Sequence, residues 1–157
     1  MAQKTFTSAI LTSADVNQFL AGEGGAWSSW SPTVTQSGSV TVTNTRSRFA
    51  RYGRTIHFSI SLVVTGSGVA NNGIAISLPV TAAASGAVTG GTGMLFDTST
   101  GLFRPFLVGP SSTTAFVVRG TAGGTGTPNL GQTGATFGAA LAVNDTIEAS
   151  GTYEAAS

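Results

Sequence analysis

A period-two alternation of apolar and polar residues dominates the chain from about residue 26 onward. It is clearest over residues 55–64, where every second side chain is apolar, the pattern of a β-strand with one face on a core. Val40 and Val42 repeat the alternation among Ser and Thr residues. Further strands are expected over residues 93–97, 102–108, 114–119 and 146–153. Short strands separated by Gly, Pro and Asn predict an all-β fold, an antiparallel β-sandwich of a jelly-roll-like kind.

A turn signal stands in the middle of this strand-rich region. The Asn72-Gly73 pair lies between Val69 and the apolar run of residues 74–78. Asn-Gly is a favoured two-residue hairpin turn, because both residues tolerate positive φ. The pair therefore predicts a β-hairpin, whose second strand ends at Pro79.

The first 25 residues follow a different pattern. Thr12 and Asp15 have the spacing of a capping box, and Gly22 is a natural helix end, so a short helix is expected between them. A helix of about nine residues is too short to be stable alone in water, so its apolar side must dock on a partner. The apolar residues of this segment are Phe6, Ile10, Leu11, Val16, Phe19 and Leu20. The sequence thus predicts an N-terminal anchoring arm over residues 1–25 and a β-sandwich domain over residues 26–157.

The chain carries little charge for its length. Only 8% of its 157 residues are charged, against roughly 25% in ordinary soluble domains. The net charge of +1 gives no steering toward nucleic acid. No apolar run is long enough to span a membrane, and we expect neither membrane insertion nor export by the general secretory pathway. Natural β-proteins protect their sheet edges with lysines, and the single lysine lies in the arm. We therefore expect sister subunits to cover the edges.

The usual catalytic and cofactor motifs are missing from the sequence. It has no cysteine and one histidine, His57, in a predicted strand, so a His/Cys zinc site is excluded. A serine nucleophile would have only His57 as its base, and no Gly-rich phosphate-binding motif occurs. The sequence predicts no enzyme activity, no cofactor and no metal, with His57 as a surface or interface residue.

Acidic residues offer one remaining route to catalysis. The candidates for a hydrolytic carboxylate pair are Asp97, Asp145, Glu148 and Glu154. Asp97 and Asp145 stand in predicted turns, where Asp ordinarily bonds nearby backbone amides. Turn formation is the favoured interpretation, and a depolymerase is the competing one.

Arginines gather in one short stretch of the chain. They are Arg46, Arg48, Arg51 and Arg54. Arg46 and Arg48 are expected to share a strand face. The stretch is either a docking patch for carboxylates or anionic glycans, or a charged edge that forms salt bridges with a neighbouring subunit.

Two tryptophans, Trp27 and Trp30, open the β-region. Their indoles are candidates for stacking on a sugar, and the competing interpretation is packing at the end of the β-domain or at an interface.

Three segments in this order resemble the outer β-domains of tailed-bacteriophage virion proteins. They are Trp27-Ser28-Ser29-Trp30-Ser31-Pro32-Thr33, Arg51-Tyr52-Gly53-Arg54-Thr55-Ile56-His57-Phe58 and Ile74-Ala75-Ile76-Ser77-Leu78-Pro79-Val80. Residues 6–17 are similar to the short segment that often opens minor tail and fibre-like proteins. The resemblance covers most of residues 5–80.

The resemblance implies a non-enzymatic virion component, assembled in the host cytoplasm. Such a protein is commonly a homotrimer, bound to other virion proteins by its N-terminal arm, and acts as a fibre tip, spike tip or head decoration in host attachment. No long shaft is present in this sequence, which favours a short knob or decoration. The alternative function is a carbohydrate-binding module that recognises host-surface glycans through Trp27, Trp30 and the arginines.

Overall fold

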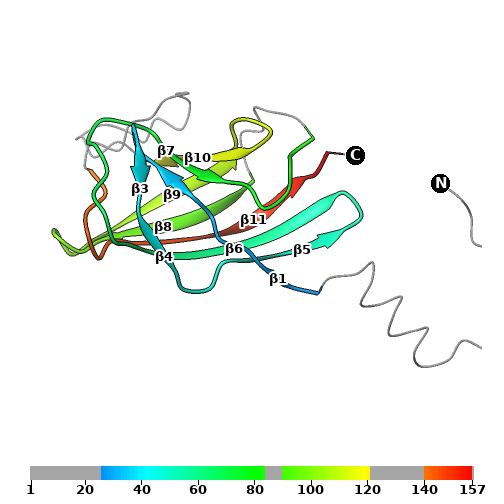
Figure 1. Cartoon of the computed structure of the whole chain (residues 1–157), viewed down its shortest axis with the longest axis horizontal. Helices are drawn as coiled ribbons and strands as arrows, with labels where there is room; N and C mark the ends of the chain where they lie inside the picture. The colour runs from blue at the N-terminus through cyan, green and yellow to red at the C-terminus, as the bar shows by residue number, and fades with distance from the viewer. Residues whose placement is uncertain (1–25, 84–89, 121–139, 157) are drawn as a thin grey trace, which may run out of the picture.

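The described part of the chain is built from antiparallel β-strands. The computed structural model describes residues 26–83, 90–120 and 140–156. The predicted arm, with its helix and the anchoring residues from Phe6 to Leu20, lies outside them. The strands (Figure 1) are β1 (Ser28–Ser29), β2 (Val34–Thr35), β3 (Ser39–Val40), β4 (Val42–Asn44), β5 (Arg48–Tyr52), β6 (Thr55–Val64), β7 (Ile74–Ser77), β8 (Gly91–Asp97), β9 (Leu102–Pro110), β10 (Ala115–Gly120) and β11 (Thr146–Glu154). The predicted all-β, antiparallel class is confirmed.

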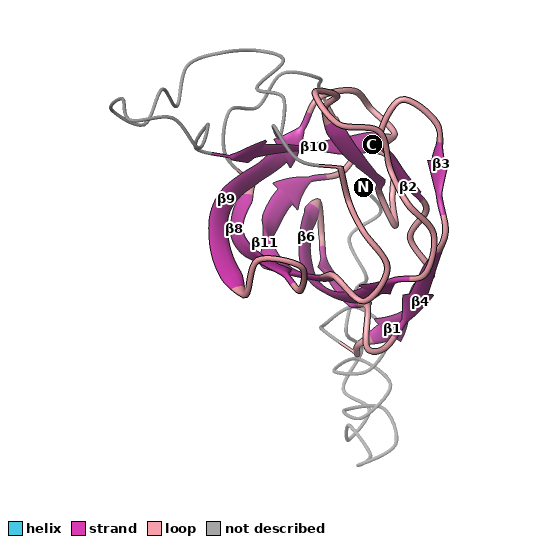
Figure 2. Cartoon of the chain, turned by 90° about the vertical axis from the view of Figure 1, so that its left-hand side faces the viewer, coloured by secondary structure: helices cyan, strands magenta, loops and turns pink. Residues whose placement is uncertain are grey.

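All these strands belong to one curled sheet. Its order is β1-β5-β6-β11-β8-β9-β10-β7-β2-β3, and β4 pairs with β6. Because β3 pairs with β2 and β4 pairs with β6, residues 39–44 connect the two sides of the curl. In Figure 2, β8, β9 and β11 lie on one side of the interior and β2 and β3 on the other. The two separate sheets of a sandwich are not confirmed, since the pairing runs through one continuous half-barrel.

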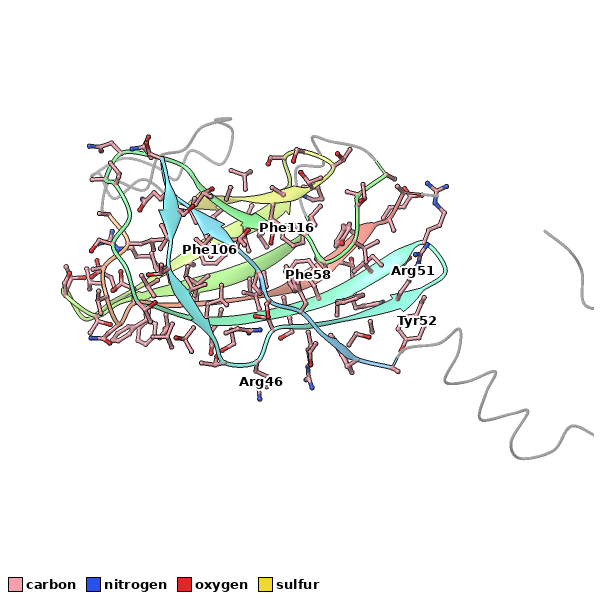
Figure 3. All side chains as sticks on the ribbon, in the orientation of Figure 1. Arg46, Arg51, Tyr52, Phe58, Phe106 and Phe116 are labelled. Atoms are coloured by element: carbon pink, nitrogen blue, oxygen red, sulfur yellow. The ribbon has the colours of Figure 1, made fainter. Side chains whose placement is uncertain are left out.

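The core fills the inside of this curl. The apolar residues of β6 are buried at every second position, and the facing positions of β11 continue the pattern. Phe58 on β6 and Phe116 on β10 have ring centroids 4.5 Å apart, although three strands separate them in the sheet order. These rings therefore join opposite walls of the curl (Figure 3). Full burial of such a side chain contributes roughly 1.5–3 kcal/mol.

Tyr153 adds a polar anchor to the same cluster. Its ring meets Phe116 edge to face at 5.4 Å. Its hydroxyl donates to the carbonyl of Val80 at 2.6 Å and accepts from the amide of Val80 at 3.1 Å. Burial raises the pKa of Tyr153 to about 12. The tyrosine thus ties β11 to the segment that follows β7.

The hairpin predicted at Asn72-Gly73 is wrong. Val69 is exposed and lies in no strand, and β7 pairs instead with β2 and β10. The Asn72 side chain donates to the carbonyls of Val69 and Ala70 at 3.4 and 3.0 Å. The pair therefore stabilises a loop that carries the chain from β6 across to the opposite wall. The Asn-Gly pair indicates a change of chain direction, but pairing with distant strands determines the partners of β7.

A buried glutamine fastens that loop to two other segments. Gln36 is fully buried; its Oε1 accepts from the amide of Leu141 at 2.9 Å, and its Nε2 donates to the carbonyl of Asn72 at 3.4 Å. A Cβ added at Gly68 would collide with the same Gln36 amide, so the loop packs closely against it. Sequence periodicity gave no signal for this buried polar residue.

Candidate functional site

A shallow groove lies on the outward face of β6, β11 and β8. Its volume is about 330 Å³. The side chains that line it are those of Arg46, Ser59, Ser61, Thr92, Met94, Glu148 and Ser150. Apart from Arg46 and Met94 at the borders, these are short hydroxyl side chains around one carboxylate. The groove is therefore polar and open to solvent.

The strand register assembles this face from distant parts of the chain. Glu148 of β11 stands opposite Ser61 of β6 and Met94 of β8. In the next row of the same face, Ser150 stands opposite Ser59 and Thr92. Because side chains alternate between the two faces of a strand, these rows project outward while the residues between them fill the core.

The charged groups of the groove have no ion-pair partners among the described residues. The two ion pairs in that part of the chain are Arg54–Glu154 and Arg104–Asp97, each at 3.1 Å. Arg46 and Glu148 take part in neither, and both are exposed. The groove thus presents a guanidinium and a carboxylate to any ligand.

The predicted arginine cluster divides into two pairs. Arg46 precedes β5 and lines the groove, and Arg48 of β5 stands opposite the groove residue Ser59. Arg51 lies near the end of β5 and Arg54 in the β5–β6 turn, and the Arg51 side chain donates to the carbonyl of Gly53 at 2.8 Å. Figure 3 shows Arg46 and Arg51 at well-separated places. Only the first pair lies on the groove face.

The segment that carries Arg46 is fixed to β6 by an irregularity in the ladder. The amides of Thr45 and Arg46 both donate to the carbonyl of Ser61, at 3.0 and 3.4 Å. When two residues of one strand stand opposite a single residue of its neighbour, the strand forms a β-bulge, which changes the direction of a side chain. It separates β4 from β5 and leaves Arg46 at the groove border.

The two tryptophans have separate environments. Trp30 packs against the core, and its carbonyl accepts from the Asn44 side chain at 2.6 Å. Trp27 is 48% exposed, and the Arg48 guanidinium lies 4.6 Å from its ring centroid. This cation–π contact holds Arg48 over the indole. Packing is therefore the structural role of Trp30, while Trp27 is exposed beside the arginines.

His57 lies on the outward face of β6, as expected for a surface histidine. Its ring meets that of Tyr52 edge to face at 5.4 Å. Its strand neighbours at this level are Ala50 and Thr152, neither of which is titratable.

Two of the four candidate carboxylates are used in turns. The Asp97 carboxylate accepts from the Ser99 hydroxyl and amide, at 2.7 and 3.1 Å, from the Thr100 amide at 3.2 Å, and from Arg104 at 3.1 Å. These bonds, led by that from the Ser99 hydroxyl, lower the pKa of Asp97 to about 2 despite its burial. Asp145 accepts from the amides of Thr98 and Ala142 at 2.9 and 2.8 Å. The interpretation of both as turn formers is confirmed.

These two aspartates hold an apolar end of the molecule in place. The apolar tip consists of Leu102 and Phe103 at the start of β9 and Val143 in the loop before β11, which are 55%, 66% and 50% exposed. The Thr98 hydroxyl donates to the carbonyl of Asn144 at 2.8 Å, joining the hairpin to that loop. In Figure 1 the β8–β9 turn lies at the opposite end of the long axis from the β5–β6 turn.

Comparison with known proteins identifies no relative. No family model matches the chain, and no curated protein or solved structure matches it significantly. Within residues 26–83, 90–120 and 140–156, no helix has the length and apolarity that a membrane crossing needs. The same residues contain no group of three or more side chains suited to holding a metal ion.

Proposed function

We propose that this chain is a structural subunit of a tailed-bacteriophage virion. It acts as a homotrimeric fibre tip, spike tip or head decoration, attached through residues 1–25 and exposing the β-domain. Within this proposal the curled sheet is a jelly-roll-like variant of the outer domains that the sequence resembles. The observation that carries the proposal is the apolar tip.

The tip supports assembly because it is both exposed and ordered. Large apolar side chains gathered at one end of a protein commonly mark an interaction surface. Here the backbone beneath them is fixed by buried carboxylates that accept hydrogen bonds from several amides. A preorganised surface loses little conformational entropy on association. The low charge of the chain agrees with the same interpretation.

A location in the virion is tested by immunogold electron microscopy. An antibody to the full chain is applied to purified particles of the phage that encodes it, and particles of an amber mutant in its gene are the control. Gold at the tail or the head surface, absent from the mutant particles, supports the proposal. Particles without label, while the chain is abundant in the soluble fraction of the same infection, contradict it.

The second candidate function is carbohydrate binding. The observation that favours it is the hydroxyl-lined groove, whose guanidinium and carboxylate form no ion pair with any residue that the structure describes. The exposed indole of Trp27 next to Arg48 agrees with it as well. A structural subunit and a glycan-binding module are compatible, because the groove and the apolar tip use different side chains.

A further inference from the structure

The groove on β6, β11 and β8 contains hydroxyl groups that are free to bind a ligand. Among the described residues, the side-chain hydroxyls of Ser59, Thr92 and Ser150 make no hydrogen bond. That of Ser61 is already bonded to Thr45 at 2.7 Å. A hydroxyl both donates and accepts, and it therefore complements the hydroxyl groups of a polyol.

The charges add a second requirement on the ligand. Arg46 at the groove border offers a planar fork of donors that matches a carboxylate. Glu148, in the middle strand, is acceptor-only when ionised, so it binds a ligand that donates. A ligand that satisfies both carries one carboxylate and several hydroxyl groups.

We propose that this groove binds an acidic sugar, that is, a saccharide unit bearing a carboxylate. Its carboxylate pairs with Arg46, its hydroxyls bond Glu148 and the serines, and an apolar patch of the ring lies against Met94. Neighbouring strands are spaced by about 4.8 Å, so the face from β6 to β8 spans about 10 Å. The groove volume of about 330 Å³ is at the small end for ligand sites, which suits one or two sugar units.

Arg48 and Trp27 extend the site along the outward face. Arg48 stands opposite Ser59 and is held over the Trp27 ring at 4.6 Å. It adds a positive charge on the same side of the groove as Arg46, and the indole offers a stacking surface for a further sugar ring. Longer acidic oligosaccharides are therefore expected to bind more tightly than the monosaccharide.

Other ligands fit less well. A polyphosphate or nucleic acid would place several negative charges near Glu148, and the chain has a net charge of only +1. A peptide docked by its side chains would require apolar pockets, whereas Met94 is the one exposed large apolar residue among those lining the groove, where Ile60 is buried in the core. An acidic sugar is the ligand class that uses every group present.

The test is a titration of the full chain with monosaccharides, followed by backbone-amide NMR shifts. The probes are glucuronic acid, N-acetylneuraminic acid, glucose and inorganic phosphate. Shifts confined to β6, β8 and β11 are expected with an acidic sugar, and much weaker ones with glucose. Loss of the charge-assisted pair in Arg46→Gln is expected to weaken acidic-sugar binding by about tenfold or more.

Two further variants separate the site from general effects. Glu148→Gln is expected to weaken the binding of both the acidic sugars and glucose, since the Glu148 carboxylate bonds to the hydroxyl groups that all of them carry. Arg54→Gln removes another exposed arginine, which lies at the β5–β6 turn and pairs with Glu154, and is expected to leave binding unchanged. Each variant is checked for a wild-type amide spectrum without ligand, which establishes that it is folded.

Several results would overturn the proposal. They are an absence of shifts with both acidic sugars, equal weakening by Arg46→Gln and Arg54→Gln, and phosphate binding as tight as acidic-sugar binding. The last would define a simple anion site. None of these results depends on subunit assembly, so they leave the proposed structural role to be judged by its own measurements.

Discussion

The carboxylate of Asp145 accepts a hydrogen bond from the backbone amide of Thr98 at 2.9 Å, linking the loop before β11 to the β8–β9 turn. Its other oxygen accepts from the amide of Ala142 at 2.8 Å. The side chain is buried, so loss of these bonds would leave two amides without their acceptor. One aspartate therefore fixes the relative position of the two segments that carry the apolar tip.

Replacement of this carboxylate is expected to loosen the tip. Asp145→Ala should lower the free energy of unfolding by about 3 kcal/mol, because hydrogen bonds to charged groups are lost and their donors stay buried. Asp145→Asn keeps one oxygen acceptor for the Thr98 amide, so its free energy of unfolding should fall by less. Urea denaturation at pH 7 measures both. Equal stability of Asp145→Ala and the wild type would show that the bond to Thr98 does not order the tip.

The pH dependence of stability is expected to reflect Asp97. Its pKa falls from 3.8 to about 2 on folding, so the unfolded chain binds the proton more tightly than the folded chain. Its contribution is therefore complete above about pH 4 and is lost as the pH falls toward 2. Wild type should exceed Asp97→Asn in stability at pH 7, and the difference should shrink near pH 2. Denaturant unfolding at both pH values measures the difference in free energy of unfolding between wild type and Asp97→Asn. A difference that is independent of pH would contradict the hydrogen bonds assigned to Asp97.

A glycine contact between β8 and β11 is expected to tolerate no side chain. Gly151 stands opposite Gly91, and a Cβ added at Gly151 would meet the carbonyl of Gly90 and the Cα of Gly91. Because these atoms belong to the backbone and cannot rotate away, Gly151→Ala should lower the free energy of unfolding by about 1–3 kcal/mol. Gly38→Ala, where a Cβ meets nothing within 4 Å, is the matched control and should stay within about 0.5 kcal/mol. Thermal unfolding compares the pair, and equal melting temperatures would show that the strands can separate there at no cost.

Much of the strand pattern could be predicted from the sequence, because alternation reports directly which side of a strand is buried. The predicted strand over residues 146–153 became β11, Thr146–Glu154, with Ile147, Ala149 and Tyr153 facing inward as expected. Partner choice could not be predicted in the same way. The Asn-Gly signal predicts a hairpin between Val69 and residues 74–78, whereas β7 lies between β2 and β10. Pairing between distant segments depends on the whole fold and not on the nearest turn.

The same limit applies to the groove. Ser59 and Ser150 are far apart in the sequence, and they become neighbours only through the register of β6 and β11. In the sequence, Glu148 is a candidate only for a hydrolytic pair, and the serines belong to no motif. Arg46 and Arg48 stand out in the sequence because they are close to each other along the chain. A polar face made of short side chains gives no sequence signal until the register is known.

Subunit assembly through the apolar tip is tested most directly by size-exclusion chromatography with light scattering on the full chain. A homotrimer is expected, with three times the 15.6 kDa mass of the chain. Combined replacement of Leu102→Ser and Phe103→Ser should convert it to a folded monomer, because it removes the two most exposed large apolar side chains of the described residues. Tyr52→Ser, 49% exposed near the opposite end, is the control and should remain trimeric. A wild-type monomer, or a trimer that survives the Leu102 and Phe103 replacements unchanged, would contradict assembly through the apolar tip.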